Sequence, residues 1–261
     1  MNFSTTAEDI DRSIKICGTP IPLPQGKVIR KGATTSQEHV RVPLPPQIVE
    51  NYVNVKLYID LFYVYKTPLL HTKSGQINLL LVQSFNSKVK HTIISGLNGV
   101  KKIYRSRGFR IVFFHGDNEF NINLLKHKMI PSDMNICAKD EHIHIIERSI
   151  RTFKELSRCT TNSVPYTIFP IIITKSLFQC QLSWLNSFLP TNGISYTIIP
   201  ATIVLGKPKP DFSKPKICFG AYALAYTKTK NDMNTRGVPA IALLESNRQG
   251  GFYFMSLRSG K

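Results

Sequence analysis

The order of strand-like and helix-like segments between residues 53 and 158 constrains the fold of this chain most. Three β-rich runs come first, separated by short turn-like spacers as in an antiparallel meander: VNVKLYIDLFYVYK, TPLLHTK and INLLLVQSF. A helix over residues 87–107 and a strand over 109–114 follow. A strand, a helix and another strand make a parallel crossover, and ligands bind at the carboxyl ends of such strands. The sequence therefore predicts a mixed α/β sheet with a binding site at one edge.

Three acidic residues are placed to form that site. Asp60 lies inside the first strand among apolar neighbours, where an acid is unfavourable unless something binds it. Asp117 directly follows the fourth strand. Glu147 lies on a predicted helix over residues 140–158, whose apolar face repeats at three- and four-residue steps and consists of Ile143, Ile146, Ile150 and Phe153. A sheet and a helix could thus bring the three carboxylates together.

The helix that carries Glu147 also carries four cations, which are Arg148, Arg151, Lys154 and Arg158. One interpretation is an ordinary surface helix, on which Glu147 and Arg151 form an i,i+4 pair. The other is a helix that holds an acid beside a polyanion. The two acids upstream, at or near strand ends, favour the second interpretation.

Charge and composition narrow the class of partner. The 261 residues carry a formal net charge of +18, of which residues 51–195 contribute +10 and residues 196–261 contribute +7. Such an excess favours a polyanionic partner, most simply nucleic acid. The five cysteines include no CxxC pair, so neither a disulfide framework nor a compact zinc site is indicated. No apolar run reaches 18 residues and the N-terminus is polar, which predicts an intracellular, soluble chain without a membrane segment.

Four segments are expected along the chain. Residues 1–50 are predicted to be an extended arm or linker, and residues 51–195 the α/β core, which also includes a short strand near residues 134–138 and a helix over about 169–189. Residues 196–216 are basic and Pro-rich, which predicts a surface linker. Residues 217–261 contain three short strand-like runs and predict a small all-β domain.

Other residues have simpler interpretations. Trp184, Cys159 and Cys180 are predicted to lie in the core, and His115 to fill space in a loop beside Asp117.

Three converging carboxylates are the arrangement expected for two-metal phosphoryl transfer. Mg²⁺ and Mn²⁺ prefer hard oxygen ligands, and two ions about 3.5–4 Å apart activate the attacking oxygen and stabilise the leaving one.

The residues named above also resemble a known family. Asp60, GDNEF at 116–120 and ERSIRTFKE at 147–155 resemble the Asp, Asp, Glu triad of retroelement integrases, and the copia-type retrotransposon branch is the most similar. Pro200, LGK at 205–207, FGAY at 219–222 and GGFYFMSLRSGK at 250–261 are similar to that branch's connection into a small β-barrel of the Src-homology 3 type. The resemblance covers roughly residues 50–261.

This resemblance implies a ribonuclease-H-like mixed five-stranded sheet with flanking helices, followed by a small barrel-like β domain. It implies a DNA strand transferase that joins element ends to target DNA, with Asp60, Asp117 and Glu147 as catalytic ligands of two Mg²⁺ or Mn²⁺ ions. It further implies a homo-oligomer on DNA, which acts in the nucleus after residence in a cytoplasmic particle. The DNA-contacting residues would be Arg148, Arg151, Lys154, Arg158, Lys207 and Lys209.

The chain departs from the family pattern in two places. Only 30 residues separate Asp117 from Glu147, a shorter interval than is usual, and the glycines expected after Asp117-Asn118 are replaced by Glu119-Phe120. No paired-histidine, paired-cysteine zinc module precedes the core, so the chain is expected to be a fragment of a larger Gag-Pol polyprotein. The alternative function is a catalytically inactive integrase relic that acts only as a nucleic-acid-binding protein.

Overall fold

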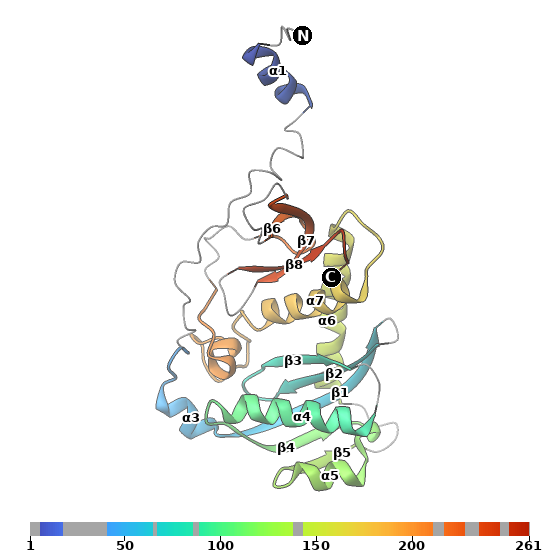
Figure 1. The fold of residues 1–261 in the computed structure, drawn as a ribbon. Coiled ribbons are helices and arrows are strands. Elements are labelled where there is room, and N and C mark those ends of the chain that lie inside the picture. Colours follow the sequence, from blue (N-terminus) through green and yellow to red (C-terminus); the bar gives the residue numbers. More distant parts are fainter. Residues whose placement is uncertain are drawn as a thin grey trace. The chain divides into compact units, whose positions relative to one another are not determined.

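The computed structural model describes residues 6–17, 41–64, 67–85, 89–137, 143–210, 217–227, 235–245 and 251–260 (Figure 1). The chain divides into two compact units. One unit is His39–Pro215, and the other combines Met1–Glu38 with Lys216–Lys261. Within the described residues, no helix combines the length and apolar character needed to cross a membrane.

The His39–Pro215 unit is built on a mixed five-stranded sheet in the order β3-β2-β1-β4-β5. The strands are β1 (Asn54–Val64), β2 (Thr67–Ser74), β3 (Leu80–Ser84), β4 (Arg110–Gly116) and β5 (Asp133–Ile136). The first three strands pair antiparallel, as the turn-like spacers predict, whereas β4 pairs parallel to β1 and β5 parallel to β4. This strand order, with flanking helices, matches the ribonuclease-H-like fold.

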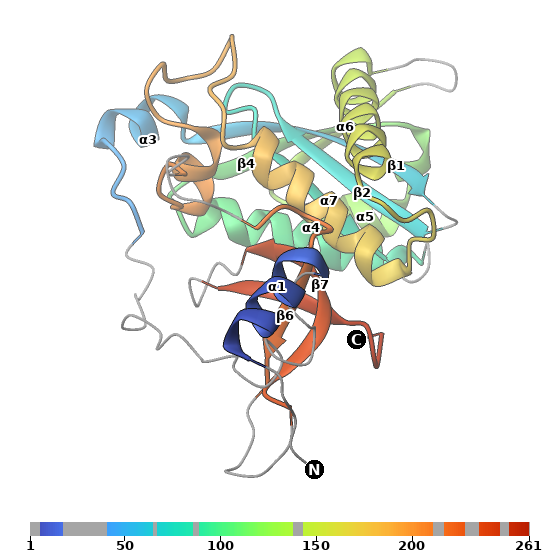
Figure 2. The same cartoon turned by 90° about the horizontal axis from the view of Figure 1, so that it is seen from above.

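The pleat of β1 separates the two faces of the sheet. Its odd-numbered residues from Val55 to Leu61 belong to one core cluster together with the buried face of α4 (Lys90–Arg105). The even-numbered residues Asp60 and Phe62 point the other way, toward α6 (His144–Ser163). Successive side chains of a strand point to opposite faces, so α4 and α6 cover opposite sides of the sheet. Figure 2 shows β2 running between these two helices.

The second face is closed by α6, which the apolar periodicity predicts, and by α7 (Ile171–Leu185), which was expected as a largely apolar helix over about 169–189. Phe153 of α6 packs against Phe62 of β1 and Phe178 of α7, with ring centroids 5.9 and 5.3 Å apart. Asn186, directly after α7, covers part of the sheet edge. Its amide side chain accepts from the Leu80 backbone N–H at 2.9 Å and donates to the Leu80 carbonyl at 2.7 Å. These bonds satisfy edge-strand groups that would otherwise face solvent or another chain.

The predicted surface linker over residues 196–216 is wrong for its first half. Residues Ala201–Leu205 form a π-helix, η2, and Ile199, Ile203 and Val204 are buried. The Arg107 guanidinium donates to the carbonyl oxygens of Val42, Thr202 and Ile203, at 2.7, 3.2 and 3.1 Å. The side chains of Ile203 and Val204 belong to the core between the sheet and α4, which we call the α4-side core. Their burial there outweighs the local preference of Gly and Pro for a linker. Residues 211–216 lie outside the described residues.

Three short helices in this unit were not predicted. They are α3 (Pro46–Tyr52), the 3-10 helix η1 (Asn118–Phe120) and α5 (Asn123–Met129). Ile48, Val49 and Tyr52 pack against the core, so residues 41–50 are part of the folded unit and not a free arm. Earlier in the chain, α1 (Ala7–Cys17) is a helix of 11 residues within the predicted arm. Residues 18–40 lie outside the described residues.

The C-terminal strands form a separate sheet in the order β6-β7-β8. These strands are β6 (Tyr222–Tyr226), β7 (Gly237–Glu245) and β8 (Phe252–Ser256), and both pairings are antiparallel. The three predicted strands are therefore present. Closure of this small domain into a barrel stays a prediction.

Candidate functional site

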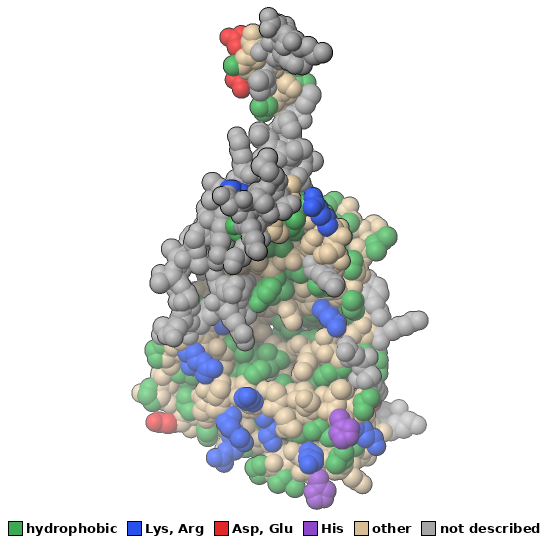
Figure 3. Space-filling view, in the orientation of Figure 1, with side chains coloured by type: hydrophobic (Ala, Val, Ile, Leu, Met, Phe, Trp, Pro, Cys, Tyr) green, Lys and Arg blue, Asp and Glu red, His purple; other side chains and the backbone are tan. Residues whose placement is uncertain are grey.

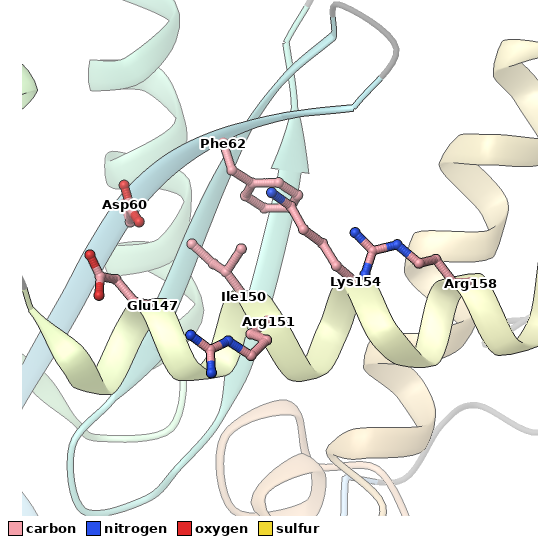
Figure 4. Close-up of a pocket in the computed structure, with 7 residues that line it drawn as sticks. All are labelled: Asp60, Phe62, Glu147, Ile150, Arg151, Lys154 and Arg158. Carbon is pink, nitrogen blue, oxygen red and sulfur yellow. The ribbon is translucent and has the colours of Figure 1, made fainter.

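A cavity of about 310 Å³ lies between β1 and α6 (Figure 4). Asp60 and Glu147 face each other near one end of it, and cationic side chains follow along the helix. The complete lining is Asp60, Phe62, Glu147, Ile150, Arg151, Lys154 and Arg158. The cavity thus combines an acidic end, an apolar floor and a basic end.

Helical geometry explains why one side of the cavity carries this sequence of charges. Glu147, Arg151, Lys154 and Arg158 follow one another at steps of four, three and four residues, so they share one face of α6. Ile150 and the neighbouring Phe153 are buried and hold this face against the sheet. One carboxylate is therefore followed by cations at intervals of about one helical turn.

Asp60 occupies an electrostatically unfavourable position. Burial raises the pKa of its carboxyl group to about 6, the backbone N–H of Leu61 acts in the opposite direction, and the charges of Asp117, Glu119 and Glu147 add to the increase. The Leu61 N–H donates to Asp60 Oδ1 at 2.6 Å. Strongly shifted pKa values of partly buried groups in a cleft are typical of functional sites. The charges of three other acids of this unit therefore act on Asp60.

Asp117 does not line the cavity, although its charge contributes to the raised pKa of Asp60. Gly116 pairs with Ile59 in the sheet, which brings the end of β4 next to Asp60. A Cβ added at Gly116 would lie 2.8 Å from Ile59 Cγ1 and 2.9 Å from Phe120 Cδ2, so only glycine permits this approach. Asp117 itself caps η1, where Oδ1 accepts from the Asn118 N–H at 2.6 Å. The structure brings Asp60 and Glu147 together and places Asp117 at the adjacent strand end.

Glu119 is an exposed acid outside the cavity whose charge acts on Asp60, and the sequence interpretation did not include it among the site residues. It lies in the GDNEF segment, two residues after Asp117. The charge of Glu119 contributes more to the raised pKa of Asp60 than the charge of Glu147 does. The signal was an acid immediately beyond the end of a parallel strand. The family resemblance treats Glu119 only as a replacement of one of the glycines expected after Asn118.

The chemistry of the carboxylates suits a hard divalent cation, but only two of them, Asp60 and Glu147, line the cavity. Their oxygens are the ligands that Mg²⁺ and Mn²⁺ prefer, and a cation would offset the repulsion that Asp60 experiences. Within the part of the chain that the structure describes, no three His, Cys, Asp or Glu side chains are close enough together to hold a metal ion. Asp60 and Glu147 are the pair that already shares one cavity.

The predicted DNA-contacting residues separate into three groups. Arg151, Lys154 and Arg158 line the cavity, and the Lys154 ammonium lies 5.2 Å from the centre of the Phe62 ring. Arg148 lies outside the cavity, close to Lys73 of β2, whose pKa is lowered by burial and by the Arg148 charge. Lys207 and Lys209 follow η2, which belongs to the α4-side core. Only Arg151, Lys154 and Arg158 line the same cavity as Asp60 and Glu147.

A buried hydrogen bond fixes α6 on the sheet. His71 of β2 is directly opposite Asp60 in the strand register, and its Nε2 lies 2.8 Å from the Ser149 hydroxyl of α6. Burial, with a further contribution from Lys73, lowers the pKa of His71 to about 3, so the ring is neutral. Its Nδ1 has no hydrogen-bond partner among the described residues. Ser149 is two residues from Glu147, so this bond sets the position of the Glu147 backbone relative to β1.

Three residues that were predicted to lie in the core are not fully buried. Trp184 is 44% exposed and stacks on Phe188, with ring centroids 6.1 Å apart. Cys159 is exposed, and Cys180 is only half-buried. All three lie on the long helices α6 and α7, where the sequence of the helix does not define which of its residues other elements cover. His115 is half-buried, and its Nε2 lies 3.1 Å from the Cys137 sulfur.

Comparison with known proteins adds one finding. No protein-family model matches the sequence, and no curated protein sequence matches it. Among solved structures, the chain is similar to the crystal structure of the catalytic core domain of BIV integrase, with a TM-score of 0.42 and 13% sequence identity. The aligned region covers 57% of this chain and 93% of that one. The fold class rests on the order and direction of the strands.

Proposed function

We propose that the His39–Pro215 unit is the catalytic core of an integrase-type DNA strand transferase, which joins DNA ends to target DNA by two-metal phosphoryl transfer. The observation that carries this proposal is the cavity between β1 and α6, where Asp60 and Glu147 face each other and three cations follow on the same helix face. Such a cavity can hold a phosphodiester by its cations and present the scissile phosphorus to the acids. The copia-type origin, homo-oligomer and nuclear site of action belong to the same proposal through the sequence resemblance.

Each group of side chains has a distinct role in this proposal. Arg151 and Arg158 would hold phosphate oxygens on either side of the reacting one, because they lie two turns apart along α6. Lys154 lies between them and is oriented by the Phe62 ring. Asp60, Asp117 and Glu147 would hold the divalent cations, which when bound polarise the phosphate and favour attack by water or a DNA 3′-hydroxyl. Phe62 and Ile150 exclude water from the floor of the cavity.

A second candidate is a nucleic-acid-binding protein without catalysis. The observation that favours it is Asp117, which does not line the cavity and whose Oδ1 accepts the Asn118 N–H. In that case the cations of α6 would still bind DNA, and the acids would only modulate binding.

Joining of a short labelled duplex in Mn²⁺ or Mg²⁺ distinguishes the two candidates. We expect Asp60→Asn and Glu147→Gln to lose joining and nicking while they retain duplex binding, because each removes one carboxylate from the cavity. Glu155→Gln is the matched control, since Glu155 is an exposed acid on the same helix but outside the cavity. Wild-type protein that binds duplex without any metal-dependent cleavage or joining would support the non-catalytic candidate. Full activity of Asp60→Asn would refute the assigned chemistry.

A further inference from the structure

A second basic surface lies on the other side of the sheet from the cavity. Helices α4 and α5 contain no Asp or Glu, and their cations are Lys90, Lys101, Lys102, Arg105, Lys126 and Lys128. Figure 3 shows Lys and Arg side chains gathered over the lower part of this face, where Figure 1 places α4 and α5. The buried residues of α4 pack on the odd-numbered side chains of β1, so this surface and the α6 cavity cannot contact one phosphodiester together.

The two helices form one continuous surface. The Lys101 ammonium donates to the Met129 carbonyl at 2.9 Å and so ties α4 to the end of α5. The pKa of Lys101 is lowered by burial and by the nearby Arg105 charge, so the cations are close enough to repel one another. Lys102, Arg105, Lys126 and Lys128 are exposed, and within the described residues none of them forms an ion pair. The mutual repulsion of these cations is therefore not offset by acids of the helices themselves.

Cations at helix C-termini have an ordinary structural explanation, since they interact favourably with the helix dipole. Lys101 fits that explanation because it caps α5. The helix dipole does not explain all of the other cations. Both helices have two or more cations in the last turn, and Lys90 lies at the N-terminal end of α4, where the dipole disfavours a positive charge. The dipole explanation predicts loss of stability on their removal and no change in ligand binding. The two accounts can therefore be separated by experiment.

We propose that the α4–α5 surface binds the phosphate backbone of a second nucleic-acid duplex, independently of the α6 cavity and of the chemistry proposed there. Helix α4 has 16 residues and spans about 24 Å at 1.5 Å per residue, which is comparable with seven base-pair steps. The surface has no exposed Phe, Tyr or Trp for stacking unpaired bases, because the one tyrosine of α4, Tyr104, is fully buried. Contacts by exposed ammonium and guanidinium groups alone are sequence-independent and suit a duplex.

Asn98 provides the sharpest test of this surface. It is exposed, one turn before Lys102 and two turns before Arg105 on α4. Asn98→Asp adds a negative charge without changing the shape of the side chain, and the new carboxylate can pair with Lys102, so the helix should not lose stability. We expect its affinity for a mixed-sequence duplex to fall about five-fold at low salt. Asn98→Ala is the control and should bind within about two-fold of wild type.

Removal of cations gives an independent measurement. The variant with Lys102, Arg105, Lys126 and Lys128 changed to Gln should lower the slope of log affinity against log salt by about 3 to 4, at roughly 0.9 per phosphate contact. The pair Lys102→Gln, Arg105→Gln has a matched control in Arg12→Gln, Lys15→Gln, which removes the same charge from α1. The α1 pair should leave the slope nearly unchanged.

The outcomes are distinct. An unchanged salt slope with a lowered melting temperature would show that these cations only support the helix ends, and would overturn the proposal. Equal effects of the α4 and α1 pairs would also overturn it, because net charge alone would then explain binding. Binding to vesicles containing phosphatidylserine but not to duplex would identify a membrane partner instead. Glu147→Gln must leave this binding intact, so failure of the proposed catalysis does not affect the result.

Discussion

Replacement of Asp60 by Asn is expected to stabilise the protein at neutral pH, although it removes a proposed catalytic group. The pKa of Asp60 is raised from 3.8 to about 6, so its charged form is disfavoured in the folded state. Asn keeps the Oδ1 atom that accepts the Leu61 N–H and carries no charge. Its side chain has nearly the same volume, so the packing around β1 should not change.

The magnitude follows from the shift in pKa. Between about pH 4 and 6 the folded protein holds a proton on Asp60 that the unfolded chain has released, so stability falls as pH rises through this window. A shift from 3.8 to about 6 corresponds to at most about 3 kcal/mol, at about 1.4 kcal/mol per pKa unit. For a folded unit of this size, that difference raises the melting temperature by roughly 5 to 10 °C.

The assay is urea unfolding of wild type and Asp60→Asn, followed by circular dichroism at several pH values from 4 to 8. The two proteins should have equal stability near pH 4, and the variant should become increasingly more stable than wild type up to about pH 7. Asp133→Asn, at an exposed position of the same unit, is the matched control and should not reproduce the pH-dependent difference. Stability curves of wild type and Asp60→Asn that stay parallel over this range would refute the account of Asp60 as a buried, repelled carboxylate.

Two further predictions concern the two sides of the sheet. Ser149→Ala should lower the free energy of unfolding by about 1–3 kcal/mol in urea titration, because His71 already has one unsatisfied ring nitrogen and would lose the partner of the other. A variant as stable as wild type would show that this bond does not hold α6. On α4, Gly99→Ala should add roughly 0.5–1 kcal/mol, since nothing lies within 4 Å of the added Cβ. Gly96→Ala should instead cost about 1–3 kcal/mol, because its Cβ would lie 2.8 Å from Phe85 Cζ. Equal thermal shifts of these two variants would contradict the packing described for α4.

The local sequence determined most of the elements of the sheet and the charged face of α6. Runs rich in apolar and aromatic residues between turn-like spacers predict β1 to β4, and the three- to four-residue spacing predicts α6. The alignment of Glu147 with Arg151, Lys154 and Arg158 is likewise a property of any helix with this sequence. The meander and the crossover predicted a mixed sheet, and the family resemblance implied five strands, whereas the order β3-β2-β1-β4-β5 comes from the structure.

Only the tertiary structure decided which distant residues meet. Pro and Gly around residues 190–210 predict a linker, but Ile203 and Val204 are buried because the α4 side of the sheet has room for them. The His71–Ser149 bond spans 78 residues of chain, and the charge of Glu119 acts on Asp60 from η1, a short helix that local patterns did not predict. Periodicity describes how a segment divides its own faces. Which face another segment covers depends on packing volumes and distances across the whole unit, and these arise only when the chain is folded.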